Sequence, residues 1–435
     1  LFSAADLTIT GTGALTVNGK GNDGITGKDG VVIESGNVTV NAIDDGIRGK
    51  DYLVINGGTI AVTSGGDGLK ADNDTDADSG YISLTGGTVK ITAQGDGADA
   101  VTDLVVTGGT LDVFSGGGSA VAPSDETSTK GLKAGVISVL EGGTIKVDSA
   151  DDAVHSDGAV HLNGADLSLA SGDDGVHAET ALVIDKGTVK LTSTVEGLEA
   201  AHITVNGGDV SIVSSDDGVN ASGSSADTAD TGGGFGGGGG EDVGDFSWVV
   251  TGGTLVVDSQ GDGLDSNGTA SISGGTVVVN GPEQGGNGAL DVNGTFDVTG
   301  GVLLAAGSSG MAVAPSTDSE QAWLSATLDS TVAAGTTLQV VDSDGKVVAT
   351  FVTSKTMQNL VFSSDKIESG KEYKIYSGGT ASGTSIGGLA ASGELGSATA
   401  VATVTSGVAP EGGGFGGGGG PRGGDQGVQP DDSGS

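Results

Sequence analysis

Apolar and polar residues alternate in short runs along most of residues 1–310. Leu53 and Ile55 form one such pair, Ile60 and Val62 form the next, and Leu69 follows alone after a turn. A period of two is typical of a short β-strand that buries one face. An α-helical solenoid would show a period of 3.6 residues instead. The pattern therefore predicts an all-β chain built from short strands.

A phrase of Asp, Gly and an aliphatic residue recurs with a fixed step. It begins at Asp23, Asp45 and Asp67, so each step is 22 residues. Three short strands per step cannot bury their own inner faces, but stacked copies can. The sequence therefore predicts a right-handed parallel β-helix of about eleven coils with roughly 22 residues per coil. Such a rod would be on the order of 50 Å long at about 4.8 Å per coil.

A second phrase, Gly-Gly-Thr, lies between these acidic phrases, for example at Gly57, Gly58 and Thr59. We expect the Gly pair to form a tight turn with positive φ, which Gly adopts freely. The phrase therefore marks a second turn in each coil.

The repeat divides the chain into segments. Residues 1–310 are predicted to form the β-helix, interrupted by a flexible Gly-rich insertion at 222–246. Strand-like runs with a hairpin signal at Asp344-Gly345 predict a C-terminal β cap over 311–405. A Gly-rich tail at 406–435 is predicted to be disordered. Because the chain opens inside a strand pattern, we expect an uncapped first coil and a processed or truncated chain.

The charge balance restricts the classes of partner. Only 17 basic residues oppose 57 acidic ones, which gives a formal net charge of −40. This balance argues against nucleic acid and anionic membranes, which need clusters of Lys and Arg, and it favours divalent cations. Cys is absent, so no disulfide framework supports the fold. No apolar run is long enough for a transmembrane helix, so none is predicted. No signal peptide is evident at Leu1.

Stacking places equivalent acids of successive coils in columns along one edge. Carboxylates one strand spacing apart repel by roughly 3 kcal/mol at an effective dielectric constant near 20, so a column needs solvent, protons, basic neighbours or bound cations. Turn carboxylates and carbonyls are the hard oxygens that Ca²⁺ prefers, although Asp also forms turns without an ion. Asp72 to Asp78, an insertion, resembles the beginning of an EF-hand loop but has no Glu at the twelfth position. The candidate Ca²⁺ ligands are Asp44, Asp45, Asp67, Asp72, Asp74, Asp96, Asp151, Asp152, Asp173, Asp174, Asp216 and Asp217.

A further row of residues lies three positions after the key acid of each coil. An apolar inward residue precedes each one, so the row should point outward. It begins basic, turns acidic at Glu199, and continues through Asn220 and Asp265. One interpretation is a basic ladder that grips the carboxylates of an acidic polysaccharide, and the other is that the bases neutralise the adjacent Asp columns. The candidate carbohydrate-binding residues are Arg48, Lys70, Lys133, His155, His177 and Glu199.

Catalysis has little support in the sequence. A pectate-lyase-like enzyme would need an Arg base beside Ca²⁺, and Arg48 is the only Arg before the tail. A hydrolase would need one unique pair of carboxylates, whereas the Asp-Asp pairs recur from coil to coil. Trp248, Trp323, Tyr52 and Tyr81 are scattered along the chain, so an aromatic platform for sugars is not predicted.

Several motifs combine the acidic turns with the residues that follow them. They are Asp151-Asp152-Ala153-Val154-His155, Asp173-Asp174-Gly175-Val176-His177, Glu196-Gly197-Leu198-Glu199, Asp216-Asp217-Gly218-Val219-Asn220, Lys70-Ala71-Asp72-Asn73-Asp74, Lys130-Gly131-Leu132-Lys133 and Gly310-Met311-Ala312. Together they resemble the bacterial carbohydrate-binding domain-containing β-helix proteins, from Leu1 to about residue 405. The resemblance implies a secreted right-handed parallel β-helix, similar to pectate lyases, that binds calcium. It also implies association with cellulose and acidic plant polysaccharides without known catalysis, and further N-terminal strands that this sequence lacks.

We therefore predict a secreted bacterial protein, extracellular or at the cell surface, that binds carbohydrate without catalysis and depends on Ca²⁺. Its expected partner is an acidic, polygalacturonate-like polysaccharide or another plant cell-wall polysaccharide. The alternative is a structural matrix or filament subunit that assembles by end-to-end stacking through open coil edges. A pectate-lyase-like enzyme is the least favoured hypothesis.

Overall fold

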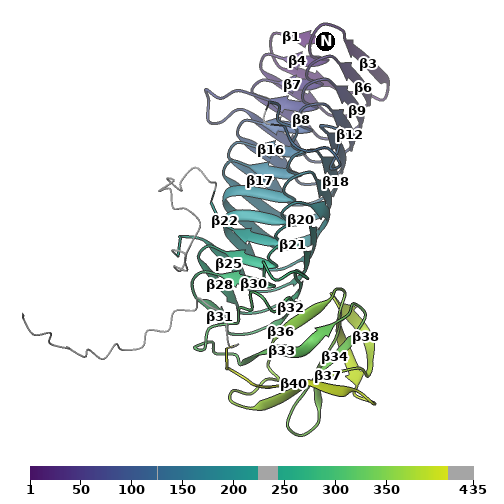
Figure 1. Ribbon diagram of the computed structural model, residues 1–435. Helices are drawn as coiled ribbons and strands as arrows, with labels where there is room; N and C mark the ends of the chain where they lie inside the picture. The colour runs from purple at the N-terminus through teal and green to yellow at the C-terminus, as the bar shows by residue number, and fades with distance from the viewer. Residues whose placement is uncertain (125, 224–242, 410–435) are drawn as a thin grey trace, which may run out of the picture.

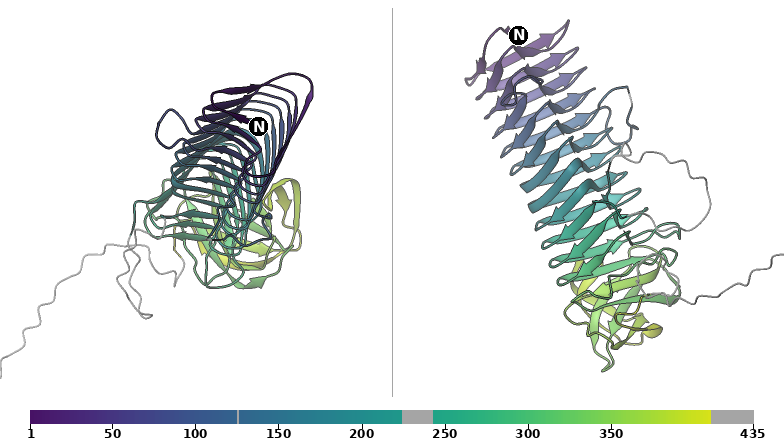
Figure 2. Two further views of the ribbon diagram at one scale, coloured as in Figure 1. Left: turned by 90° about the horizontal axis from the view of Figure 1, so that it is seen from above. Right: turned by 90° about the vertical axis from the view of Figure 1, so that its left-hand side faces the viewer.

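The computed structural model describes residues 1–124, 126–223 and 243–409, and these residues form β-strands and no helix. Most of them build one parallel β-solenoid of about 13 turns, roughly 22 residues apart, with the first coil at the top of Figure 1. Figure 2 shows the coils stacked side by side along the rod. The predicted all-β parallel β-helix is confirmed. It has more turns than the sequence phrase suggested, because coils near both ends, such as those of Phe2 and Leu290, lack Asp-Gly.

Part of the predicted segments lies outside the described residues. Residues 224–242 of the predicted Gly-rich insertion and residues 410–435 of the predicted tail belong to this part.

Each coil contributes three strands, and equivalent strands form three parallel columns. The first column contains short strands, most of which directly follow an acidic turn: β1 (Phe2–Ser3), β4 (Ile25–Gly27), β7 (Ile47–Gly49), β10 (Leu69–Ala71), β13 (Ala98–Ala100), β16 (Leu132–Ala134), β19 (Val154–Ser156), β24 (Val219–Ala221), β27 (Leu264–Ser266) and β30 (Leu290–Val292). The second column contains β2 (Leu7–Ile9), β5 (Gly30–Ile33), β8 (Tyr52–Ile55), β11 (Tyr81–Leu84), β14 (Asp103–Val106), β17 (Ile137–Leu140), β25 (Ser247–Val250), β28 (Thr269–Ile272) and β31 (Phe296–Val298). The third column contains β3 (Ala14–Gly19), β6 (Asn37–Ala42), β9 (Thr59–Ser64), β12 (Thr88–Ala93), β15 (Thr110–Ser115), β18 (Thr144–Ser149), β23 (Asp209–Ser214), β26 (Thr254–Ser259), β29 (Thr276–Asn280) and β32 (Val302–Gly307).

In the middle of the rod the turns between columns straighten, and strands of one coil run together. These continuous strands are β20 (Ala159–Ser171), β21 (Val176–Thr194) and β22 (Leu198–Val205). They still pair in parallel with their neighbours, and register shifts mark the places where the turns would lie.

From β4 to β32 the inner faces of the solenoid strands are buried as the alternation predicts. Leu53, Ile55, Ile60, Val62 and Leu69 are each at most 2% exposed. Complete burial of such a side chain stabilises the fold by about 1.5–3 kcal/mol. One apolar core therefore runs along the whole solenoid.

Glycine is favoured at both turn phrases, for different reasons. In the Gly-Gly phrase the second residue has positive φ, for example 97° at Gly58. Gly57 does not, but a Cβ there would lie 2.9 Å from the Glu34 carbonyl oxygen of the preceding coil. In the Asp-Gly phrase, a Cβ on Gly68 would lie 2.3 Å from Ile91 Cγ2. The predicted positive φ thus holds for one Gly of the pair, and close coil stacking explains the others.

The C-terminal edge of the solenoid is covered. The backbone N–H of Ser316 donates to the Phe296 carbonyl at 2.7 Å, and that of Gln321 donates to the Val298 carbonyl at 2.9 Å. Strand β36 (Met357–Ser363) pairs antiparallel with both β32 and β33 (Trp323–Val332). Strands β31 and β32 therefore do not present a free edge there.

A second, antiparallel sheet follows, with the strand order β38 (Thr380–Ile386), β39 (Leu389–Glu394), β35 (Val347–Val352), β34 (Thr337–Val341), β37 (Glu372–Ser377) and β40 (Thr399–Thr405). It lies beside the end of the rod in Figure 1. Lys355 Nζ contacts Asp258 Oδ1 at 2.6 Å and donates to the Asn280 carbonyl at 3.2 Å. Val278 and Leu304 of the solenoid are buried in a second apolar core shared with this sheet.

A search of the described residues for membrane spans finds no helix of sufficient length and apolar character to cross a bilayer.

Candidate functional site

The middle residues of the first-column strands form one outward row, here called the charged row. Parallel register places His155 beside His177, and His177 beside Glu199. All six predicted carbohydrate-binding residues lie in this row. The row also includes Asp99 and Asp291, which the prediction omitted because their coils depart from the 22-residue step. Its members are Thr26, Arg48, Lys70, Asp99, Lys133, His155, His177, Glu199, Asn220, Asp265 and Asp291.

The acids directly before the turn Gly or Ala form a second line, here called the inner acid column. One carboxylate oxygen of a typical member accepts a backbone N–H from the next coil. Asp45 Oδ1 accepts from Asp67 at 2.9 Å, and Asp67 Oδ1 accepts from Asp96 at 2.8 Å. The same bond recurs in four further places. The backbone N–H groups of Lys130, Asp174, Asp262 and Gly288 donate to Oδ1 of Asp96, Asp152, Asp217 and Asp262, respectively. The column consists of Asp23, Asp45, Asp67, Asp96, Asp152, Asp174, Glu196, Asp217 and Asp262.

These bonds give the inner acids a structural role that the sequence did not predict. A hydrogen bond to a charged group stabilises a fold by about 1.5–3 kcal/mol. The second oxygen of each carboxylate remains available, and in the N-terminal half of the solenoid it faces the bases of the charged row.

Lysines of the charged row neutralise the inner acids. Lys70 Nζ contacts Asp67, and it lies 3.4 Å from Asp99 Oδ2 and 4.0 Å from Asp45 Oδ2. Lys133 Nζ lies 3.8 Å from Asp99 Oδ1. Burial alone would lower the pKa of Lys70, but the surrounding carboxylates outweigh burial and raise it. This geometry supports the interpretation that the bases neutralise the Asp columns.

Arg48 neutralises Asp72, the first residue of the insertion. Its Nη2 donates to Asp72 Oδ2 at 2.6 Å, and its Nε donates to both Asp72 oxygens at 3.1 Å. The hydrogen bonds to Asp72 raise the pKa of Arg48. Asp74 is exposed. The insertion therefore presents one carboxylate held by Arg48 and others in solvent.

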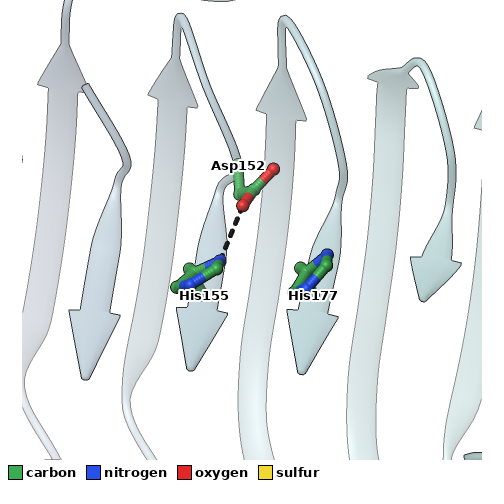
Figure 3. Close-up of side chains that lie close together, drawn as sticks. All are labelled: Asp152, His155 and His177. Atoms are coloured by element: carbon green, nitrogen blue, oxygen red, sulfur yellow. Dashed lines mark hydrogen bonds and ion pairs between the residues drawn. The ribbon is translucent and has the colours of Figure 1, made fainter. Parts of the chain in front are cut away.

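Two imidazoles and three carboxylates gather in the middle of the rod. His155 and His177 are stacked, with ring centroids 4.9 Å apart and planes 18° apart. Figure 3 shows the two rings side by side on adjacent strands. His155 Nδ1 lies 2.8 Å from Asp152 Oδ2. His177 Nδ1 lies 3.0 Å from Asp174 Oδ2 and 2.8 Å from Glu199 Oε2. We call these five residues the His cluster.

The pKa shifts of this region follow from burial and from its crowded carboxylates. Burial alone would raise the pKa of Asp152, but the adjacent imidazole and the Lys130 ammonium hold it well below its usual range. Burial would lower the pKa of His177, but Asp174 and Glu199 outweigh burial and raise it. Burial also raises the pKa of Asp174. The cluster therefore requires protons or another cation to balance its carboxylates.

Four groups of three side chains have ligand atoms within 4.8 Å of one another, as a metal site requires. Two contain only carboxylates and two contain imidazole nitrogens. The groups are Asp23, Asp44 and Asp45; Asp151, Asp152 and Asp173; Asp152, His155 and His177; and Asp174, His177 and Glu199. These acidic and mixed groups could hold a metal ion.

The first carboxylate group fits Ca²⁺ better than the second. Lys130 Nζ lies 2.9 Å from Asp151 Oδ1 and 2.7 Å from Asp152 Oδ2, so an ammonium already neutralises the second group. The cations nearest the first group lie farther away, with Arg48 Nη1 3.9 Å from Asp23 Oδ2 and Lys70 Nζ 4.0 Å from Asp45 Oδ2. In the first group Asp44 is exposed, while Asp45 is buried. Burial raises the pKa of Asp45 to about 6.

Asp23 completes the first group, and the sequence prediction missed it. The prediction used Asp23 only as the start of the first Asp-Gly phrase and did not include it among the Ca²⁺ ligands. Its signal was present in the register, because Asp23 begins the same Asp-Gly phrase one coil before Asp45. Three carboxylates from two coils supply hard oxygens of the kind that Ca²⁺ binds.

The C-terminal half of the acidic edge has few basic partners. Burial raises the pKa of Glu196 to about 7, of Asp217 to about 7 and of Asp262 to about 6, and neighbouring carboxylates add to each shift. Within the part of the chain that the structure describes, no ion pair reaches these three acids. Asp216 beside them is exposed.

The large aromatic rings do not form a sugar platform. Trp248 and Trp323 are each 2% exposed, and Trp248 packs edge-on against Phe296 at 5.1 Å. Tyr52 and Tyr81 stack on each other on adjacent coils, with centroids 5.6 Å apart. The two Trp rings are therefore packed in the interior, and each Tyr ring has one face covered by the other Tyr ring.

Comparison with known proteins links the acidic edge to a family. No curated protein and no solved structure matches the chain. Residues 1–175 match the sequence model of a family described as carbohydrate-binding domain-containing protein. These residues include the Asp23, Asp44 and Asp45 group. The match confirms, over residues 1–175, the resemblance to carbohydrate-binding domain-containing proteins and supports a carbohydrate-binding role.

Proposed function

We propose that this chain is a secreted bacterial protein that binds carbohydrate without catalysis. Its ligands are acidic, polygalacturonate-like or other plant cell-wall polysaccharides, and Ca²⁺ mediates the binding. The observation that carries the proposal is the family match over residues 1–175. The solenoid adds a straight edge with side chains that repeat at about 4.8 Å, a spacing similar to that of sugar units in a polysaccharide.

The charges of the edge favour a bridging cation over direct contact with bases. The cationic groups of Arg48, Lys70 and Lys133 already lie against carboxylates of the protein. The chain also has a formal net charge of −40. Such a protein repels a polyanion unless cations lie between the two sets of carboxylates. A direct grip by the charged row is therefore the weaker mechanism.

Asp23, Asp44 and Asp45 are the group that we propose for this Ca²⁺. Ca²⁺ takes six to eight oxygen ligands, and Asp45 uses Oδ1 for the backbone N–H of Asp67. The three carboxylates therefore leave coordination positions for water or for a uronate carboxylate. Asp44 is exposed and contributes no hydrogen bond among the described side chains, so its carboxylate is accessible from solvent.

Affinity measurements on polygalacturonate test this proposal. The full chain should be retained with Ca²⁺ and released by a calcium chelator, and Asp44→Asn should weaken retention about tenfold. Asp74→Asn, an exposed acid outside the four groups, is the matched control and should bind normally. Retention that is unaffected by the chelator would exclude the Ca²⁺ bridge, and retention by neutral cellulose alone would exclude the acidic ligand.

The absence of catalysis is also part of the proposal. The Asp-Asp pairs recur in several coils, and the inner acid of a pair is engaged in coil-to-coil hydrogen bonding. A catalytic pair would instead be a single arrangement with distinct acid and base roles. Incubation of the purified chain with polygalacturonate should release neither unsaturated products nor new reducing ends; either product would overturn this part of the proposal.

End-to-end filament assembly receives less support from the structure. Stacking requires an open coil edge at each contact, and Ser316, Gln321 and β36 cover the C-terminal edge. Carbohydrate binding is therefore the first proposal. Sedimentation at high protein concentration with Ca²⁺ should show monomers, and long polymers would favour the structural alternative.

A further inference from the structure

The far nitrogen of each imidazole in the His cluster also faces a carboxylate. His155 Nε2 lies 2.9 Å from Asp157 Oδ1, and His177 Nε2 lies 3.6 Å from Glu179 Oε1. Each Nδ1 faces a carboxylate as well, that of Asp152 for His155 and that of Asp174 for His177. A cation that takes the place of the Nδ1 proton would leave the remaining ring proton on Nε2, directed at Asp157 or Glu179.

A lone pair and a carboxylate oxygen repel each other at hydrogen-bond distance unless a proton or a cation lies between them. The problem is greatest at His177, whose Nδ1 lies within 3.0 Å of both Asp174 and Glu199. One N–H cannot point at both acceptors with good geometry. Lys130 lies against Asp152, and no other Lys or Arg among the described residues forms an ion pair with the cluster.

We propose that the His cluster is a site for a divalent transition metal, with Zn²⁺ as the best-fitting ion. His155 Nδ1 and His177 Nδ1 supply the nitrogen ligands, and carboxylates of Asp152, Asp174 and Glu199 supply oxygens. The proposal goes beyond the carbohydrate-binding function and uses a different group from the Ca²⁺ group at Asp44.

The ligand set selects the class of metal. Imidazole suits Zn²⁺, Cu²⁺ and Ni²⁺, whereas Ca²⁺ and Mg²⁺ prefer oxygen alone. Ligands about 2.1 Å from a tetrahedral ion lie roughly 3.4 Å from one another. The ligand atoms of both mixed groups already lie within 4.8 Å of one another. Each group therefore places three ligands near one ion, and His177 belongs to both groups.

The surroundings match those of protein metal sites in two further respects. Asp152 is 3% exposed, Asp174 is 7% exposed and His155 is 9% exposed, so the ligands are held by the packed edge. In protein metal sites a carboxylate commonly accepts the second ring N–H of a metal-bound His, and its loss weakens metal affinity by about 10–100-fold. Asp157 and Glu179 occupy those positions. The ion would join three successive coils at the point where the charged row turns acidic.

Zn²⁺ titration of the full, untagged chain tests the proposal, with nitrogen NMR of the imidazoles as the readout. One equivalent of Zn²⁺ should shift Nδ1 of His155 and His177. His177→Gln should weaken the affinity at least tenfold, and Asp157→Asn should weaken it about 10–100-fold. His161→Gln is the matched control, because His161 also pairs with one Asp, Asp185 at 2.8 Å, but lies outside the charged row.

Three outcomes would overturn the site. They are the absence of saturable Zn²⁺ binding at micromolar concentration, equal shifts at the His161 or His202 rings, and displacement of Zn²⁺ by equimolar Ca²⁺. The unmodified chain gives all three readouts, so the test stands even if a variant does not fold. The titration contains no polysaccharide, so its failure is distinguishable from failure of Ca²⁺-dependent carbohydrate binding.

Discussion

Single carboxylates on the acidic edge perform two tasks at once. In Asp67, Oδ1 accepts a backbone N–H from the next coil while the other oxygen meets Lys70. In Asp217, Oδ1 likewise accepts the Asp262 N–H at 2.6 Å, but the position of the charged row beside it holds Asn220 instead of a base. The same backbone interaction therefore has a different electrostatic environment in the two halves of the rod.

Asp217→Asn should remove part of the pH dependence of stability. Burial raises the folded-state pKa of Asp217 to about 7, so the folded state holds this proton more tightly than the unfolded chain does. The resulting stabilisation is fully present below about pH 4 and is lost as the pH rises through about 7. The amide keeps the acceptor for Asp262 but cannot ionise. We expect a Tm higher than that of the parent by on the order of 2 °C at pH 8, with little difference at pH 4, measured by calorimetry with a chelator.

Asp344→Asn provides the comparison for this prediction. Asp344 lies exposed in the turn between β34 and β35, far in sequence from the acidic edge. Its substitution should change Tm by the same small amount at both pH values. If Asp217→Asn also shifts Tm equally at pH 4 and pH 8, its raised pKa does not affect stability as argued.

At the scale of strands, the alternation and the 22-residue step were sufficient to predict the fold. Both signals report the inner face, and the solenoid strands share one rule: residues such as Ile55 and Val62 point inward because coils can only bury them by stacking. The continuous strands β20 to β22 were not predictable in this way. Strands β20 and β21 run through isolated glycines, Gly164 and Gly187, where most other coils have a Gly-Gly pair, and β22 ends before such a pair at Gly207 and Gly208.

The site was less predictable because its contacts depend on register between coils of unequal length. Asp99 reaches Lys70 across a coil with a 29-residue step, so a search at 22 residues misses it. The columns themselves were visible in the sequence, but the use of one oxygen by the next backbone N–H was not. The periodic Asp residues therefore indicated the correct edge without showing which carboxylates were already engaged.

Gly68→Ala should show how tightly neighbouring coils approach. A Cβ at Gly68 would lie 2.3 Å from Ile91 Cγ2 and 2.5 Å from the Gly97 carbonyl oxygen. Overpacking of this kind costs about 1–3 kcal/mol, and denaturant unfolding would measure it. Because Ala153 occupies the equivalent turn position of another coil, we expect a loss of stability without a loss of fold.

Gly21→Ala is the matched substitution for that experiment. Gly21 is exposed and has no heavy atom within 4 Å of a built Cβ. The free energy of unfolding should change by less than about 0.5 kcal/mol. If both substitutions change the free energy of unfolding equally, the change in backbone entropy, and not contact between coils, determines the effect.

The whole rod is stabilised mainly by contacts between neighbouring coils, so its stability can differ along its length. Charge compensation differs in the same way. Lys70 neutralises the inner acid of the β10 coil, whereas no described ion pair reaches Asp217 and Asp262 in the β24 and β27 coils. Basic side chains therefore compensate the acidic edge near β10, whereas the described ion pairs leave Asp217 and Asp262 uncompensated near β24 and β27.

Amide hydrogen exchange should reveal this gradient as a dependence on pH. The raised pKa values of Asp217 and Asp262, about 7 and 6, mean that both acids are mainly protonated at pH 5 and mainly ionised at pH 7.5 or above. The raised pKa of Lys70 keeps its ammonium charged throughout this range. After correction for intrinsic rates, protection of β24 and β27 should fall at least tenfold relative to β10 between pH 5 and pH 8, since about 1.4 kcal/mol of opening free energy is tenfold in protection. Equal changes in all three strands would mean that the coils open as one unit and that the missing bases of the charged row do not set local stability.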